Sequence, residues 1–70
     1  MAHIRKFPPI SADVPMPGVW QLTPARPMVR HEFASAARLF NKWGSRRNSE
    51  SEAVAYAACW GMHLTRVDAA

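Results

Sequence analysis

The chain has 70 residues, of which nine are Lys or Arg and five are Asp or Glu, so its net charge at neutral pH is +4. This length allows one small domain with a core near the lower limit for independent folding, and the single cysteine excludes a disulfide scaffold within the chain. The longest apolar run, the ten residues from Ala53 to Met62, is about half of a membrane span. We therefore expect a cytoplasmic protein with no membrane segment, and its positive charge favours anionic partners.

Residues 1–27 contain all six prolines of the chain. Proline fixes its own backbone angle, lacks an N–H donor and pushes the preceding residue toward extended conformations, so we expect an extended arm here. Short strands are predicted beside it, weakly over residues 4–7 and better over residues 19–23, where Trp20 and Leu22 would share one face. Two structures stay open for the arm: it folds back over the rest of the chain, or it stays free for a partner.

An amphipathic helix is predicted in the next segment, because apolar residues recur at spacings of three and four with polar residues between them. It is expected to begin at about His31 or Ser35 and to end at Trp43. Gly44 follows at a place where glycine commonly ends a helix in the left-handed conformation. The predicted buried stripe consists of Phe33, Ala36, Ala37, Phe40 and Trp43.

A second helix is predicted over residues 49–61. Ser49, with Glu52 three residues later, matches a capping box, and acidic residues suit the positive end of a helix. Gly61 is a point at which this helix can end. Its expected buried residues are Ala53, Ala57, Trp60 and Leu64.

The segment after Gly61 predicts a short strand over residues 62–67, because Thr65 and Val67 favour extended structure. A helix that continues to Arg66 is the alternative. Trp43 and Trp60, at the ends of the two helical stripes, are expected to pack together.

These elements predict a small α+β domain with two antiparallel helices, a short C-terminal strand and an extended proline-rich N-terminal half. Residues 28–70 would form a helix–turn–helix–strand core, and residues 1–27 would pair with it or wrap it. The alternative fold is a helical hairpin with a loose N-terminal arm.

Catalysis and metal binding are not indicated by the sequence. Cys59 and His63 are four residues apart, but a structural zinc site needs four ligands, and His3 and His31 would have to come from distant segments. Three glycines form no phosphate-binding loop, and no acidic pair has a catalytic spacing. We expect no enzyme activity, no cofactor and no metal.

A helix-turn-helix DNA reader is disfavoured as well. The second helix would present Glu50 and Glu52 to a polyanion, and the turn before it is longer than that motif uses.

The remaining expectation is a small basic binding protein: a regulator, an inhibitor of the kind that phages or plasmids encode, or an assembly subunit. It would dock on another protein through an apolar arm and a basic surface, with Trp20 as an exposed anchor. A nucleic-acid binder that contacts phosphates through the same basic surface is the alternative, and a homodimer is possible. The expected partner-binding residues are Phe7, Met16, Trp20, Arg38, Lys42, Arg46 and Arg47.

Overall fold

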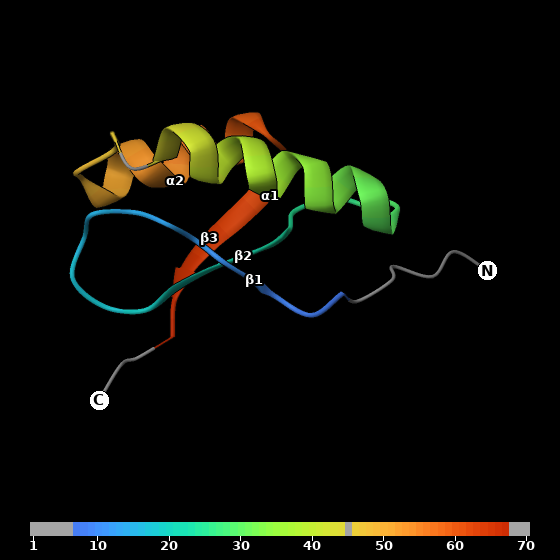
Figure 1. Ribbon diagram of the computed structural model, residues 1–70, viewed down its shortest axis with the longest axis horizontal. Coiled ribbons are helices and arrows are strands. Elements are labelled where there is room, and N and C mark those ends of the chain that lie inside the picture. Colours follow the sequence, from blue (N-terminus) through green and yellow to red (C-terminus); the bar gives the residue numbers. More distant parts are fainter. Residues whose placement is uncertain (1–6, 45, 68–70) are drawn as a thin grey trace.

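The computed structural model describes residues 7–44 and 46–67 (Figure 1). Its elements, in chain order, are β1 Ile10–Ser11, β2 Trp20–Pro24, α1 Arg30–Gly44, α2 Glu50–Cys59 and β3 Met62–Arg66. The strands form one antiparallel sheet in the order β1-β2-β3, and both helices lie on the same side of it. The predicted α+β class and the C-terminal strand are thus confirmed. Within the described ranges, no helix is long and apolar enough to cross a bilayer.

The middle strand, β2, alternates between the core and the open face of the sheet. Trp20 and Leu22 are buried, as predicted, whereas Gln21 and Thr23 are less buried on the other side. The predicted strand is observed one residue later in the chain than expected. β3 shows the same alternation, because Met62 and Leu64 are buried and the residue between them is exposed.

The proline-rich half forms part of the folded domain. β1 pairs with β2, with Ile10 opposite Leu22, and the backbone N–H of Ala12 donates to the carbonyl of Trp20 at 2.9 Å. Phe7 stacks on Phe33 of α1 with ring centroids 5.9 Å apart. The alternative of a helical hairpin with a loose arm is therefore wrong for the described part of the arm. The strand predicted over residues 4–7 lies outside the described residues except for Phe7, which precedes β1.

The core lies between α1, α2 and the covered face of the sheet. Phe33, Phe40, Leu22 and Met62 are its largest fully buried side chains. α1 contributes the predicted stripe except for Trp43, whose side chain is 40% exposed. Among the described residues, the buried hydrophobic side chains of the core are Trp20, Leu22, Met28, Phe33, Ala36, Ala37, Phe40, Ala53, Ala57, Met62 and Leu64.

Gly44 takes the place on the buried stripe that was predicted for Trp43. It lies four residues after Phe40, is buried, and is the last residue of α1. It does not have a positive φ, so the prediction that it ends the helix in the left-handed conformation is wrong. A Cβ on Gly44 would lie 3.0 Å from the Phe40 ring, so the absence of a side chain serves close packing.

The start of α2 follows the predicted cap. Ser49 is the N-cap, and its side-chain oxygen accepts a hydrogen bond from the Glu52 backbone N–H at 3.3 Å. The Glu52 carboxylate binds the Arg47 guanidinium, with an Nη1–Oε1 distance of 3.2 Å. The Arg47–Glu52 ion pair thus joins the first turn of α2 to the loop before it.

Gly61 ends the second helical segment and begins the turn into β3. Its φ of 75° lies in the left-handed region, where a side chain is strained. Its carbonyl accepts a hydrogen bond from Ala25 at 2.9 Å, which anchors the turn to the end of β2. The prediction of a strand after Gly61 is confirmed, and the alternative of a helix continuing to Arg66 is wrong.

Candidate interaction surface

A group of basic side chains lies along the C-terminal half of α1 and the loop after it. Arg38 and Lys42 are exposed and lie one helical turn apart on α1, so they share a face. We use the name basic surface for Arg38, Lys42, Trp43, Arg46 and Arg47.

Trp43 lies against two of these cations. The Lys42 Nζ atom is 5.3 Å from the Trp43 ring centroid, and the Arg46 Cζ atom is 5.1 Å from it. Both are within the range of a cation–π interaction. The prediction that Trp43 is a core residue that packs against Trp60 is wrong, because Trp43 is exposed and the Trp60 ring instead lies edge-on to Tyr56 at 6.3 Å.

The cations of the basic surface fall into two groups. Within residues 7–44 and 46–67, Arg38, Lys42 and Arg46 form no ion pair with a carboxylate. Arg47, in contrast, is bound to Glu52 and lies over the Tyr56 ring, with its Cζ atom 4.3 Å from the centroid. Arg47 therefore serves mainly to join the loop to α2, and the first three cations have their charge available to a partner.

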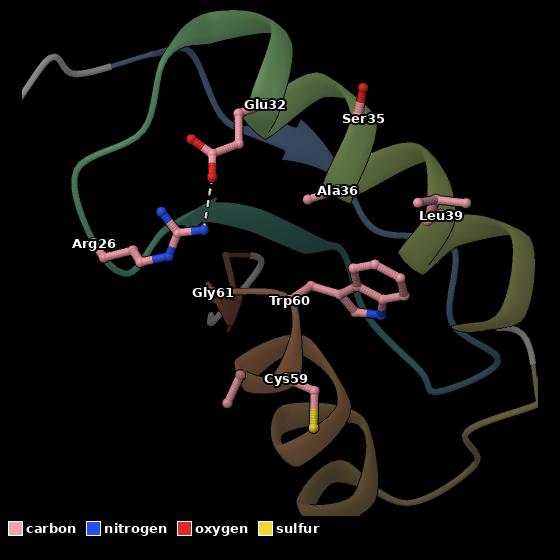
Figure 2. Close-up of a pocket in the computed structure, with 9 residues that line it drawn as sticks. Arg26, Glu32, Ser35, Ala36, Leu39, Cys59, Trp60 and Gly61 are labelled. Carbon is pink, nitrogen blue, oxygen red and sulfur yellow. Dashed lines mark hydrogen bonds and ion pairs between the residues drawn. The ribbon is translucent and has the colours of Figure 1, made fainter.

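A groove of about 500 Å³ opens beside α1, where α1 faces the end of α2 and the turn into β3 (Figure 2). Its wall includes Leu39, which is 37% exposed and precedes Trp43 by one helical turn. The residues that line it are Arg26, Glu32, Ser35, Ala36, Leu39, Ala58, Cys59, Trp60 and Gly61. Leu39 therefore lines the groove one helical turn from Trp43 of the basic surface.

An ion pair stands at one end of this groove. The Arg26 Nη2 atom lies 2.7 Å from the Glu32 Oε2 atom, and Figure 2 shows the two side chains reaching toward each other. This hydrogen bond from Arg26 lowers the pKa of the Glu32 carboxyl. Both side chains are substantially exposed, so the pair contributes little to stability.

The arm residues predicted to bind a partner are engaged within the domain. Trp20 is only 6% exposed, and its indole N–H donates to the Pro17 carbonyl at 3.1 Å. The expectation that Trp20 is an exposed anchor is therefore wrong, because β2 directs it into the core. Phe7 and Met16 are partly buried against the same core.

Of the predicted binding residues, the structure places Arg38 and Lys42 on one face of α1 and brings Lys42 and Arg46 together at Trp43. Arg47 is directed to Tyr56 and Glu52 instead. Trp43 of the basic surface and Leu39 of the groove wall were missed as binding candidates. The signal for Trp43 was Gly44, since Gly44 continues the spacing of Phe40 on the buried stripe and leaves Trp43 to one side.

Cys59 and His63 do not share a helix face. Cys59 is exposed at the end of α2, whereas His63 is exposed on β3, beyond the turn at Gly61. In the described part of the chain, no three His, Cys, Asp or Glu residues are grouped closely enough to hold a metal ion. No protein-family model, curated protein or solved structure matches this chain.

Proposed function

We propose that this protein is a non-catalytic binding protein that docks on an acidic protein surface through its basic surface and Leu39. The observation that carries the proposal is the exposed Trp43 ring between Lys42 and Arg46, two cations without a carboxylate partner in the described part of the chain. Tryptophan and arginine dominate the residues that contribute most to protein interfaces. In this proposal Trp43 replaces Trp20 as the anchor.

A protein partner suits this surface because apolar and cationic groups alternate on it. Leu39 and Trp43 are both more than a third exposed and lie one turn apart. Such a pair fits an apolar side chain of the partner, while the neighbouring cations fit carboxylates around it. The positive charge would also speed the encounter with an acidic protein.

Nucleic acid is the second candidate, and the free charges of Arg38, Lys42 and Arg46 favour it. Two features of the same region weigh against a polyanion. Arg47 is already neutralised by Glu52, and Glu50 adds a further negative charge at the start of α2. Three available cations would support only weak phosphate binding, which salt would weaken further.

The test compares two sets of probes against the same variants. Peptides selected from a random display library serve as the protein probes, and mixed-sequence duplex DNA and single-stranded RNA serve as the nucleic-acid probes. We expect the selected peptides to carry carboxylates around an apolar residue and to lose roughly tenfold or more in affinity on Trp43→Ala or on Lys42→Glu with Arg46→Glu.

Arg30→Glu is the matched control for the single charge reversal Arg46→Glu, because it changes the net charge equally at the other end of α1 and lies outside the groove. It should leave peptide binding within about twofold. Equal losses in Arg30→Glu and Arg46→Glu would show a net-charge effect and contradict the proposed surface. Binding of DNA or RNA at 50 mM salt that falls by orders of magnitude at 200 mM would replace the protein partner with nucleic acid.

A further inference from the structure

The groove beside α1 is walled by the two helices and by the turn after α2. Ala36 and Leu39 come from α1, Ala58 comes from α2, and Trp60 comes from the turn that follows it (Figure 2). None of the described residues that line the groove belongs to a strand. Leu39 and Ala58 are exposed, so the groove offers apolar contacts from both walls to a partner.

The charged side chains in the groove wall bind each other. Arg26 and Glu32 form the ion pair at one end, and they are the only charged residues among the described residues that line the groove. A small charged ligand would need a free charge or several polar groups that converge on it. The groove is therefore better suited to apolar side chains than to a small ion.

A segment that enters this groove must satisfy its own backbone. A bound strand normally pairs with a sheet edge, where a row of N–H and C=O groups is available. The groove has no such row, because its walls are side chains of α1 and the end of α2. A helix forms all of its central backbone hydrogen bonds internally, so a helix fits this groove better than a strand does.

The exposed apolar residues of α1 also have the spacing that a neighbouring helix uses. Leu39 and Trp43 lie four residues apart and are both more than a third exposed. Glu32 and Trp43 are eleven residues apart, which is about 16 Å along the helix axis. A partner helix of about three turns covers that length.

The two sides of the groove differ in charge. On α1, Arg38 and Lys42 are exposed beside Leu39, and neither forms an ion pair with a carboxylate in the described part of the chain. On α2, the groove is lined by Ala58, and the charged residues of this helix are confined to its first turn. A helix in the groove therefore meets cations along one flank and small uncharged side chains along the other.

We propose that the groove binds an amphipathic helix of the partner protein. An apolar side chain of that helix lies between Leu39 and Trp60, and its carboxylates lie along the flank next to Arg38 and Lys42. This inference rests on the proposed function, because it names the structural element with which an acidic protein would meet the same region. The second flank of the partner helix carries small or apolar residues against α2.

Two alanines of α2 provide a matched pair of variants. Ala58→Trp fills the groove, whereas Ala55→Trp places the same side chain at an exposed position of α2 that does not line it. The probes are the peptides selected from the display library on the unsubstituted protein. We expect Ala58→Trp to weaken their binding roughly tenfold or more, and Ala55→Trp to leave it within about twofold. Circular dichroism and urea unfolding check that both variants are folded.

Cys59 reports occupation of the groove without any substitution. It is the only cysteine of the chain, it is exposed, and it lines the groove. A saturating peptide should slow the alkylation of Cys59 by iodoacetamide roughly tenfold or more, because the bound helix covers the thiol. The peptide should gain helical circular dichroism on binding, and a proline at its central position should weaken binding roughly tenfold or more.

The outcomes separate this inference from the proposed function. No gain in helical signal, tolerance of the central proline, an unchanged rate of Cys59 alkylation, or equal binding to both tryptophan variants would each overturn the helix in the groove. If such a peptide still loses affinity on Trp43→Ala, the proposed function stands and only this inference fails. If no selected peptide depends on Trp43, the proposed function fails and this inference fails with it.

Discussion

The Asn41 side chain acts toward Ser11 as a neighbouring strand would. Its Nδ2 atom donates to the Ser11 carbonyl at 3.0 Å, and its Oδ1 atom accepts from the backbone N–H of Asp13 at 2.8 Å. One residue of α1 thus satisfies two outward backbone groups of the proline-rich half and fixes that half against the helix.

Asn41→Ala should lower the free energy of unfolding by about 1–2 kcal/mol, because two hydrogen bonds are lost at a partly exposed site. It should also leave the β1 edge open to association. Asn48→Ala, at an exposed loop position, is the control and should change little. Urea unfolding measures both variants, and equal stabilities would show that the Asn41 contacts contribute nothing.

Gly44→Ala tests whether close packing against Phe40 excludes a side chain at the last residue of α1. In an exposed helix this substitution stabilises by roughly 0.8–1.0 kcal/mol. Here the new methyl would lie 3.0 Å from the fully buried Phe40 ring, so we expect a net loss of about 1–2 kcal/mol. In a Phe40→Leu background the same substitution should cost less. If Gly44→Ala raised the free energy of unfolding while Phe40 is present, crowding between the new methyl group and Phe40 would be contradicted.

The two tryptophans Trp20 and Trp43 should respond oppositely to truncation. Trp20→Ala removes a buried ring and should cost about 3–5 kcal/mol, which is enough to unfold much of so small a domain. Trp43→Ala should change stability by less than about 1 kcal/mol, because the ring is substantially exposed. Circular dichroism with urea distinguishes the two, and a similar loss in both would contradict the exposed position of Trp43.

Glu32 should make stability depend on pH in the acid range. Its pKa is lowered in the folded protein by the hydrogen bond from Arg26, so the unfolded chain binds this proton more readily. The resulting stability is present above the unfolded pKa, near 4.5, and is lost as the pH falls through the folded value. Glu32→Gln should therefore flatten the acid side of the stability profile, which urea unfolding at a series of pH values measures.

Local signals in the sequence predicted most of the helical half. The spacing of Phe33 and Phe40 marked the buried face of α1, and Ser49 marked the start of α2. Gly61 was correctly identified as a possible end of the second helix, because a glycine in the left-handed conformation is a local requirement.

Those local signals do not predict contacts between segments that are distant in the sequence. The prolines around β1 indicated only an extended chain, and nothing local shows that Ile10 pairs with Leu22 or that Asn41 binds Ser11. Trp43 was misplaced for a related reason. An apolar residue at helical spacing fits either the core or its margin, and the choice depends on how closely Phe40 packs against Gly44.

The position of β2 between its neighbours also constrains the order of folding. Trp20 pairs with Arg66, so β2 cannot complete its pairing until β3 is present, and β3 follows both helices in the sequence. During synthesis α1 and α2 emerge before that segment, and their apolar faces have no complete sheet to cover them. Because closing such long loops slows folding, we expect Phe33 and Phe40 to stay incompletely covered in the growing chain until β3 has been synthesised.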